Sequence, residues 1–418
     1  MNERFVIPAR LRMTSLGLIA VGLLTIIIGA IVLLGSKDPV TADYDKIRFW
    51  NSLLHNSIFF LVISAASIFI QAASSLAQGG WLVAYRRVPE AIGSNVWIFG
   101  IIAIVVMFLV AYVFRIHTPH GEFNPIYRWM TPTDPHTGGL DEVIEGKSAF
   151  LNGKMFGIFT VVTIGLWSYF GLKFRQISLK QDAAPKNSTK LYWRNVTLSG
   201  VFLIVYGLTQ MSTSPWMWIM SIDAHWYSTM FSWYSWASAF VTGMGLILMW
   251  VVYLKNQGYM ELVTKEHVHD LGKLMFAFSI FWTYVWFAQF MLIWYGNIPE
   301  ETTYFKVRMQ GPYSVIWFAV FIICFIMPIL ILMSRPSKRN YFTVTFMAMT
   351  IFFGHWLDYY QMIYPGSIGA HWSMSWYEVG VVCGFAGVMM LAVATSLAKH
   401  PLVPSNHPML KEAMLHVS

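Results

Sequence analysis

The stretch TSLGLIAVGLLTIIIGAIVLLG at residues 14–35 decides the fold class, because it is long and apolar enough to cross a bilayer as one helix. A bilayer core of about 30 Å takes roughly 20 apolar residues in helical form. Arg4, Arg10 and Arg12 precede the stretch, as basic residues precede the apolar part of a signal peptide. This apolar run is too long for a signal peptide, and no clear small-residue cleavage site follows it. We therefore expect an uncleaved anchor helix.

Nine further stretches are also long and apolar enough to span a bilayer. Hydrophobic residues make up 56% of the 418 residues and charged residues only 11%, whereas soluble domains carry about 25% charged residues. Such a chain has too few charges to cover a water-exposed surface, which excludes a soluble protein. The sequence predicts an all-α integral membrane protein with about ten transmembrane helices, at residues 14–35, 52–78, 92–115, 153–174, 195–215, 229–253, 271–295, 312–333, 341–363 and 377–397.

The basic residues give the chain a net charge of +8, but they lie in short segments between the apolar stretches and form no face for nucleic acid. Eighteen of them lie at the termini and in the loops that follow even-numbered spans, and eight lie in the other loops. Basic residues concentrate on the cytoplasmic side of membrane proteins. The distribution therefore predicts that both termini are cytoplasmic.

A tandem repeat is suggested by Trp50 and Trp226, which each open a predicted helix with the pattern W-x-S. These two residues are 176 positions apart. When the sequence is shifted by the same 176 positions, the start of the third predicted span coincides with the start of the seventh. Four spans separate the two copies, so both have the same orientation in the membrane. We expect two tandem four-helix bundles and two peripheral helices, divided into residues 1–50 (first peripheral helix), 51–215 (first bundle), 216–365 (second bundle) and 366–418 (last helix and tail).

Ionisable residues at membrane depth are few, and they are functional candidates because burying a charge in lipid costs several kcal/mol. His355 and Asp358 in FFGHWLDYY (352–360) are three residues apart and so share a helical face. We expect them in the outer half of their span. The candidates at the ends of the later spans are Asp223, His225 and Glu378 on the outer side, and His269, Asp270 and Lys273 on the cytoplasmic side.

These residues have two interpretations. In the first, they form two half-channels for protons, with Thr283, Tyr284 and Gln289 in the apolar gap between the polar ends. In the second, they cap helices and pair with one another at headgroup level. Both interpretations stay open for Asp270 and its neighbour, Lys273. We favour proton transfer for the pair on the ninth span.

Asn51 and His55 share one face of the second predicted helix, at its outer end. An amide and an imidazole at this spacing are suited to hydrogen-bond a quinone carbonyl, and the histidine is suited to accept a proton from a quinol. Alternatively, the two side chains satisfy backbone groups at the start of the helix. The residues alone favour this second interpretation.

Redox cofactors bound by this chain are not expected. Cys324 and Cys383 lie in apolar stretches, and no CxxCH motif for covalent haem is present. A transmembrane haem would need paired histidines, and only His55 and His355 lie clearly inside spans. Most tryptophans and tyrosines are predicted at the membrane interfaces, among them Trp216, Trp218, Trp226, Trp294, Tyr295, Trp372 and Trp376.

The longest outer loop, at about residues 116–152, carries His117, His120 and His136. Three histidines are enough to hold a metal, but these share no ligand spacing, so a polar cap without a metal is the favoured interpretation. The proline, glycine and aspartate residues of the loop predict little regular structure.

Two segments resemble a known family: MSTSPWMWIMSIDAHWYSTMF (211–231) and HVHDLGKLMFAFSIFWTYVWFAQFMLIWYGNIPEET (267–302). Both are similar to the NrfD-type membrane subunits of alternative complex III, a quinol:cytochrome c oxidoreductase. Polysulfide reductase membrane subunits are more distant relatives. The ten-span layout also agrees, so the resemblance covers nearly the whole chain. The SPWMWIMSIDAHW segment is most similar to the smaller, ActF-type subunits.

The resemblance implies a bacterial inner-membrane subunit that takes part in quinol oxidation coupled to proton movement. It implies a second NrfD-like subunit, an iron–sulfur subunit and a multihaem cytochrome c subunit as partners, with a terminal oxidase as a further partner. The c-type haems and iron–sulfur clusters would lie on those partners, and quinol or menaquinol would be the substrate. Asn51 and His55 match the polar pair that relatives place near quinone. The residues that fall where proton half-channels are proposed in this family are Asp223, Asp270, Lys273, His355 and Asp358.

Two further hypotheses are a stand-alone secondary transporter and a purely structural anchor for peripheral redox subunits. Tandem bundles with buried charges suit a transporter, but the broken helices that transporters pair near the midplane are not evident. An anchor would tolerate substitution of Asp270 or Asp358.

Overall fold

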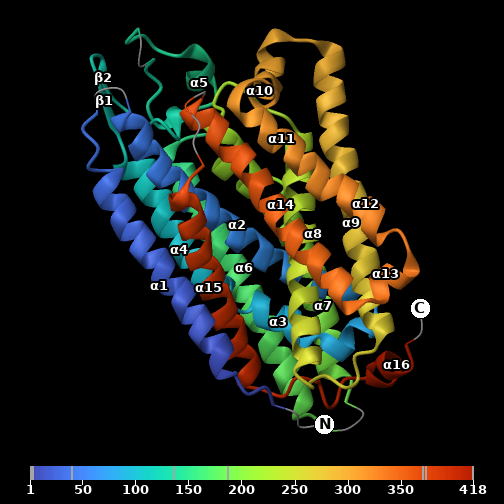
Figure 1. Cartoon of the computed structure of the whole chain (residues 1–418). Coiled ribbons are helices and arrows are strands. Elements are labelled where there is room, and N and C mark those ends of the chain that lie inside the picture. Colours follow the sequence, from blue (N-terminus) through green and yellow to red (C-terminus); the bar gives the residue numbers. More distant parts are fainter. Residues whose placement is uncertain are drawn as a thin grey trace.

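The computed structural model describes residues 4–38, 41–134, 137–185, 188–369, 371 and 374–416. Long helices run side by side between two ends of the molecule (Figure 1). The terminal end holds Arg4 and Pro401, which pair in a β-bridge. The hairpin end holds the antiparallel strands β1 (Ile116–Thr118) and β2 (Gly121–Phe123). The described parts of the two termini thus meet at one end, as expected for an even number of spans.

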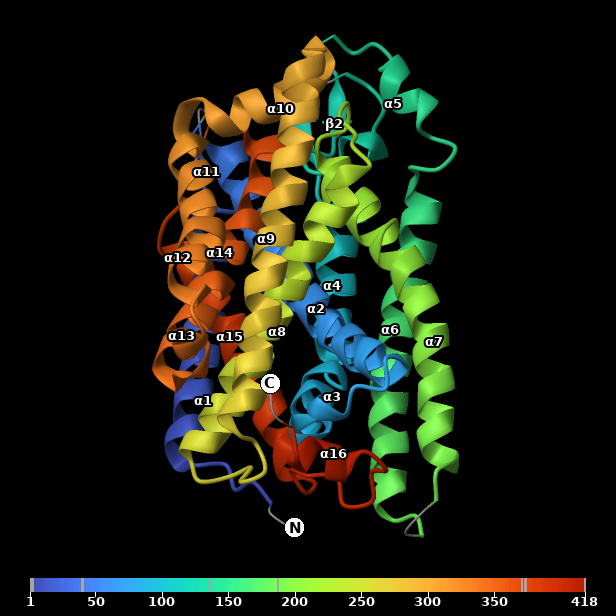
Figure 2. The same ribbon diagram turned by 90° about the vertical axis from the view of Figure 1, so that its right-hand side faces the viewer.

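The first bundle consists of α2 (Ala42–Leu76), α4 (Val96–Phe108), α6 (Gly153–Asp182) and α7 (Lys190–Gln210). α2 packs against α4 and α7, and α6 packs against the same two helices. The short helix α3 (Arg87–Gly93) precedes α4, and a π-helical turn at Leu109–Val113 extends the C-terminal end of α4. Figure 2 shows α6 and α7 at one side of the molecule and the helices of the second bundle at the other.

The second bundle consists of α8 (Met230–Asn256), α9 (Lys265–Gly296), α14 (Tyr341–Ile368) and one composite helix. In the composite helix, α11 (Ser314–Phe321) continues through a π-helical turn at Ile322–Ile326 into α12 (Met327–Leu332). α8 packs against α9 and α14, and both α8 and α14 also contact α2. α2 and α8 therefore form the centre of the molecule, where both are almost entirely buried.

The peripheral helices α1 (Ala9–Val32) and α15 (Trp376–Ala398) pack against each other along their length. Gly22 and Gly384 meet at the crossing, where a Cβ on either residue would overlap the backbone of the other. Small residues allow transmembrane helices to approach this closely. α15 joins the pair to α2 and α3.

Every predicted span coincides with one of these helices. Nine helices in the described part of the chain are long and apolar enough to cross a membrane. α14 matches them in length but is less apolar, because it carries His355, Asp358 and several tyrosines. The prediction of an all-α integral membrane protein is confirmed, and the chain is a multi-pass membrane protein.

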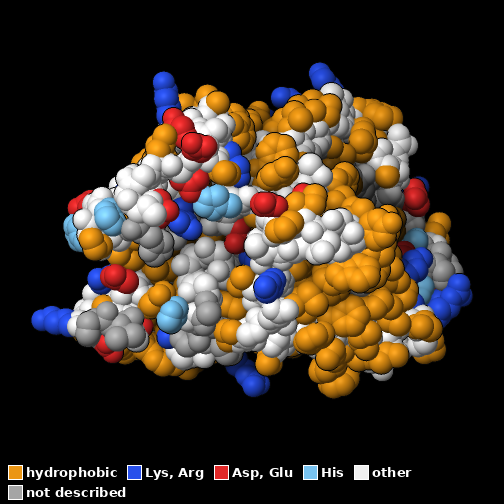
Figure 3. All heavy atoms as spheres, turned by 90° about the horizontal axis from the view of Figure 1, so that it is seen from above, with side chains coloured by type: hydrophobic (Ala, Val, Ile, Leu, Met, Phe, Trp, Pro, Cys, Tyr) orange, Lys and Arg blue, Asp and Glu red, His pale blue; other side chains and the backbone are white. Residues whose placement is uncertain are grey.

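The remaining elements are short. The outer loop was predicted to hold little regular structure, but it contains the β1–β2 hairpin and a helix capped by Asp141. Seen from the hairpin end, charged and histidine side chains gather on the side of β1 and β2, and hydrophobic side chains cover the other side (Figure 3). The short helices are Gly80–Tyr85, Arg128–Met130, α5 (Glu142–Gly146), Thr213–Ile219, Met220–Ile222, α10 (Pro299–Met309), Gly311–Tyr313, α13 (Arg335–Arg339) and α16 (Leu410–Met414).

Candidate functional site

A buried polar cluster lies where α8, α9 and α14 meet. Asp358 accepts hydrogen bonds from the Tyr234 hydroxyl and, at 3.0 Å, from the indole N–H of Trp282. His355 lies one helical turn away, with its Nδ1 3.6 Å from Asp358 Oδ2. The Ser238 hydroxyl is 2.9 Å from the same imidazole nitrogen. We call these five residues the central cluster.

The central cluster lies near the middle of α14. This helix extends to Ile368, beyond the predicted end at residue 363. The midpoint of α14 falls between residues 354 and 355, so His355 lies at the middle of the helix and Asp358 lies in the half toward the hairpin end. The middle of this bundle was expected to be apolar, but the His355 imidazole lies there, and the Asp358 carboxylate lies about one turn nearer the hairpin end.

The charge of Asp358 has little compensation. His355 is the only basic side chain within 4 Å of this carboxylate in the part of the chain that the structure describes. A buried carboxylate without a cation is costly, so such a group takes up a proton or shares one with its neighbour. His355 Nε2 has no hydrogen-bond partner among the described residues. The pair is thus suited to hold one proton and to exchange it through the free nitrogen.

The three residues expected to bridge the gap do not join the central cluster. The Tyr284 side chain is 66% exposed and points away from the bundle. The Thr283 hydroxyl donates to the carbonyl oxygen of Ser279 in its own helix at 2.9 Å. Gln289 is buried, but no described residue pairs with its Nε2. The bridging role predicted for Tyr284 was therefore wrong.

Asn51 and His55 share a face of α2, and both are completely buried against α14. Asn51 Nδ2 donates to the Ser367 hydroxyl at 2.6 Å, and His55 Nε2 is 3.0 Å from the carbonyl oxygen of Trp356. Side chains of α14 fill the space beside the pair, so quinone binding here would require them to move. The aromatic rings packed around His55 on this side are those of Trp356, Tyr360 and Tyr364.

A buried ion pair lies at the hairpin end. Arg308 of α10 donates to Asp223 at 2.8 Å and to the carbonyl oxygens of Gln361 and Tyr304 at 2.9 and 3.0 Å. Its guanidinium group stacks on the Tyr304 ring at 3.4 Å. Burial lowers the pKa of Arg308, but Tyr304 and Asp223 outweigh this effect, so the net shift is upward. The sequence gives no signal for this contact, because Arg308 falls in a polar segment between two predicted spans.

Tyr304 connects the hairpin end with the central cluster. Its ring stacks on Trp226 with the centroids 3.8 Å apart. Tyr304 lies close enough to Asp223 and to Asp358 to interact electrostatically with each carboxylate. Tyr234 in turn interacts with Tyr304. Tyr234, which donates to Asp358, and Tyr304 therefore lie near both the partly exposed Asp223 and the buried Asp358.

Glu378 and His225 lie apart from the central cluster. Glu378 pairs with Arg48 of α2 at 2.6 Å and caps the start of α15. His225 Nε2 lies 2.6 Å from Asp141 in the outer loop. Burial raises the pKa of Asp141, but the Ile144 N–H and His225 outweigh this effect and hold it below its usual value. Both contacts are of the capping and pairing kind that the alternative interpretation expects.

The polar residues at the start of α9 form a second cluster, at the terminal end. Asp270 pairs with Lys273 at 2.9 Å and lies 3.8 Å from His269 Nδ1. His416 of the C-terminal tail approaches the other Asp270 oxygen to 2.5 Å. The Lys273 side chain is half exposed. The structure therefore brings three of the predicted residues together, along with a tail histidine that the sequence did not indicate.

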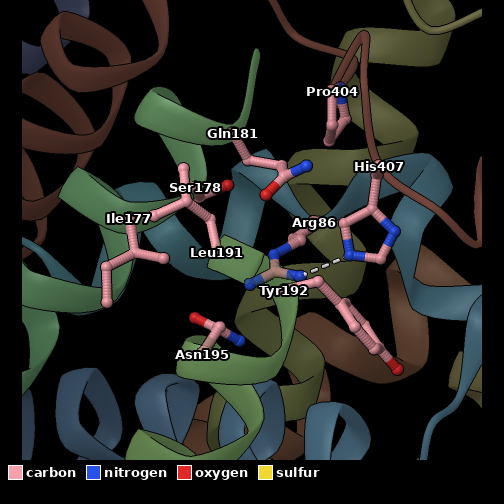
Figure 4. Close-up of a pocket in the computed structure, with 9 residues that line it drawn as sticks. All are labelled: Arg86, Ile177, Ser178, Gln181, Leu191, Tyr192, Asn195, Pro404 and His407. Atoms are coloured by element: carbon pink, nitrogen blue, oxygen red, sulfur yellow. Dashed lines mark hydrogen bonds between the residues drawn. The ribbon is translucent and has the colours of Figure 1, made fainter. Parts of the chain in front are cut away.

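The C-terminal tail also borders a small pocket between α6, α7 and the turn before α3 (Figure 4). Arg86 donates to His407 Nε2 and to Glu90, both at 2.8 Å, and Gln181 donates to the carbonyl oxygen of Asn406 at 3.0 Å. The pocket volume of about 10 Å³ admits one water molecule. Burial and the Arg86 charge lower the pKa of His407 to about 3. A neutral His407 is the form that accepts a hydrogen bond from arginine.

The aromatic residues predicted at the membrane interfaces differ in exposure. Trp294, Tyr295 and Trp376 are at least half exposed, as residues at a membrane interface would be. Trp218 and Trp226 are buried, and Trp218 donates to the Thr160 hydroxyl at 2.9 Å. Among the remaining residues predicted at the interface, Trp216 is 36% exposed, and Trp372 lies outside the described residues.

The outer histidines and the cysteines show no metal or disulfide chemistry in the described residues. His117 lies 3.4 Å from Glu122 on the exposed hairpin, and His136 falls outside the described residues. No group of three or more His, Cys, Asp or Glu in the described part is placed to hold a metal ion. Cys324 and Cys383 are both free thiols, and Cys324 is buried 3.8 Å from His355 Nδ1.

The partners of Asp358 and His355 on α8 and α9 were not predicted. One signal in the sequence points to α8, where small polar residues recur every three or four positions and so mark one helical face. These residues are Ser232, Ser235, Ser238 and Thr242, and all four are buried.

Comparison with known proteins adds no family assignment: no family model matches the chain, and no curated protein matches it. The resemblance to NrfD-type subunits therefore rests on residues 211–231 and 267–302 and on the helix layout.

Proposed function

We propose that this protein is a membrane subunit that passes protons through its second bundle, with Asp358 and His355 holding the proton in transit. The observation that carries the proposal is the environment of Asp358. This carboxylate is completely buried on a long helix of the membrane bundle, is hydrogen-bonded by Tyr234 and Trp282, and has His355 as its only described basic neighbour. Ionisable groups at such depth are retained for function, because apolar residues stabilise a core as well or better.

The proposed path on the hairpin side leads from Asp223 through two tyrosines to Asp358. A tyrosine hydroxyl both donates and accepts a hydrogen bond, so it relays a proton without changing its net charge. Asp223 is part of the ion pair with Arg308, which keeps a polar group at the mouth of this path. Asp358 then exchanges the proton with His355 Nδ1 across 3.6 Å.

The proposed path on the terminal side begins at His355. Nδ1 of this imidazole faces both Asp358 and Ser238, so the proton leaves from the free Nε2. The Thr242 hydroxyl, which donates at 2.7 Å to the carbonyl oxygen of Ser238, lies one turn further toward the terminal end on α8. Asp270, with its contacts to Lys273 and His416, is the titratable group at the end of the bundle. Water between Thr242 and Asp270 would complete this half of the path.

The sequence resemblance supports an electron-transfer complex as the setting of this proton path. We propose that the chain is the smaller NrfD-like subunit of a quinol:cytochrome c or quinol:oxidase oxidoreductase in a bacterial inner membrane, with both termini cytoplasmic. The proposed partners are a second NrfD-like subunit, an iron–sulfur subunit, a multihaem cytochrome c and a terminal oxidase. The haems and clusters belong to those partners, and quinol is the substrate of the complex.

A quinol role for Asn51 and His55 has weaker support than the proton path. Both residues are completely buried, and tyrosines of α14 fill the space in front of them. The resemblance alone favours a quinol site here. We therefore assign quinol oxidation to the complex and not to these two side chains.

The test is purification through a tag on this chain in mild detergent, followed by mass spectrometry, an absorbance spectrum and reconstitution into vesicles. We expect c-type haem and iron–sulfur subunits to copurify, and quinol oxidation to acidify one side of the vesicle membrane. Asp358→Asn should retain assembly and lose the proton movement. A colourless, monodisperse chain without partners would overturn the complex and favour a transporter. Full proton movement in Asp358→Asn would leave the chain as an anchor.

A further inference from the structure

A cavity of about 450 Å³ separates the second bundle from the peripheral helix pair. α8 and α14 line one side, α1 and α15 line the other, and Phe60 of α2 lies at its inner end. The cavity begins at the terminal end beside Leu11 and Asn256, which lie at the ends of α1 and α8. It reaches inward to Phe352 and Ala386, near the middle of their helices.

The lining of this cavity suits a hydrocarbon chain and not a quinol headgroup. Only three of its fourteen lining residues are polar, namely Tyr253, Asn256 and Thr345, and none is a His, Asp, Glu, Lys or Arg. Quinol oxidation needs a group that accepts a proton near neutral pH, and this lining offers none. Flexible, polarisable methionines adapt to apolar ligands of irregular shape, and this lining contains Met249, Met349, Met389 and Met390.

Basic residues lie at the mouth of the cavity. Arg10 and Arg12 flank Leu11 in the first turn of α1, and both are exposed. Neither has an acidic partner within 4 Å among the described residues, whereas several arginines elsewhere in the chain are paired. The cavity thus combines a long apolar interior with two unpaired positive charges where the helices end.

We propose that the cavity binds one acyl chain of an anionic phospholipid, with the phosphate held beside Arg10 and Arg12. The polar lining residues lie toward the terminal end and the purely apolar ones lie deep, which is the order of polarity along a phospholipid in that leaflet. The bound chain fills the space between α14 and α15 and so holds the α1–α15 pair against the second bundle. This inference does not depend on the proposed proton path.

The first test is native mass spectrometry of the purified protein, with its partners, after addition of phosphatidylglycerol or phosphatidylcholine. We expect one tightly held phosphatidylglycerol per chain. Ala386→Trp fills the cavity and should abolish that retention. Ala392→Trp is the matched control, because Ala392 is a half-buried residue of α15 outside the cavity, and this variant should retain the lipid.

The second test addresses the headgroup. Arg10→Gln with Arg12→Gln should weaken phosphatidylglycerol retention at least fivefold and leave phosphatidylcholine unchanged. Arg194→Gln with Arg335→Gln removes two exposed arginines outside the cavity and should have no effect. Equal retention of both lipids by the wild type, or retention by Ala386→Trp, would overturn the proposal. Displacement of phosphatidylglycerol by menaquinone at equal concentration would instead identify a quinone site. If Ala386→Trp fails to fold, the arginine variants decide the outcome.

Discussion

His55 and His355 are both completely buried imidazoles, yet their surroundings differ. His55 packs among aromatic rings and contacts the backbone carbonyl of Trp356. His355 contacts the Ser238 hydroxyl and lies 3.6 Å from Asp358. Burial alone therefore does not mark a histidine as a proton carrier. The Asp358 carboxylate beside His355 distinguishes the second residue from the first.

The same contrast separates the buried charges of the two bundles. At the terminal end of the first bundle, Glu90 is buried between Arg86 and Arg87, and Arg87 also pairs with Asp182. In the second bundle, Asp358 has two neutral hydrogen-bond donors and one histidine. A carboxylate held by arginines stays ionised and serves as a structural link. A carboxylate without them is the kind of group to which we assign the proposed proton transfer.

The largest effect is expected from Asp358→Asn. The amide retains most of the hydrogen-bonding surface but does not ionise, so proton movement in reconstituted vesicles should fall by about 100-fold or more, the scale of general acid–base contributions. Thermal stability should change little. Asp43→Asn, which alters an exposed carboxylate paired only with Lys46, is the control. Unchanged proton movement in Asp358→Asn would show that Asp358 carries no proton, and that it serves only as a structural link, as Glu90 does.

Arg308→Gln should give the next largest effect, on stability. Removing one partner of a buried ion pair typically costs about 3–5 kcal/mol, because the other charge loses its compensation. Asp223 is partly exposed, so we expect the lower end of this range, measured by denaturant unfolding in detergent. Lys306→Gln, an exposed charge on the same helix, should change the free energy of unfolding by less than about 0.5 kcal/mol. Equal effects of the two variants would contradict a structural role for Arg308.

Glutamine at each of the two buried histidines tests the comparison directly. His355→Gln should slow proton movement about tenfold, which corresponds to about 1.4 kcal/mol, because this change removes the one basic side chain that lies within 4 Å of Asp358 among the described residues. His55→Gln should leave the rate within about twofold. If His55→Gln instead raises the KM for quinol while proton coupling per quinol stays intact, the pair with Asn51 forms a quinol site.

The smallest effect concerns the C-terminal tail and pH. The pKa of His407 falls from 6.5 to about 3 in the folded protein, so the tail docked on Arg86 binds fewer protons than the free tail. The contribution of His407 to the free energy of docking is therefore fully present above pH 6.5. It is lost as the pH falls from 6.5 toward 3, by at most about 1.4 kcal/mol per pH unit. The protection factors of residues 401–416 in hydrogen exchange, corrected for the intrinsic pH dependence of exchange, should fall as the pH is lowered from 7 to 5. His407→Gln should flatten this dependence; an unchanged profile would assign it to another group.

The helix positions were predictable from the sequence because hydrophobic length is a local property. In lipid, the backbone N–H and C=O groups of a segment such as 14–35 must form hydrogen bonds within that segment, so it becomes a helix whatever its neighbours are. The pairing of His355 with Asp358 was also predictable, since their spacing of three follows from the helical period. The end of this helix was predicted less accurately, because α14 continues through Gly366 and Ser367 to Ile368, beyond the predicted end at residue 363.

The environment of the pair was decided by the tertiary structure alone. Tyr234 and Trp282 lie 124 and 76 residues from Asp358 in the chain, on helices whose rotation about their own axes the hydrophobic pattern leaves undetermined. A helix that is apolar on nearly all sides gives no signal for which face meets its neighbours. The sequence alone therefore determined which segments cross the membrane. Packing between those segments decided that Asp358 meets a hydroxyl, an indole and an imidazole, and that His55 meets only aromatic rings and a carbonyl.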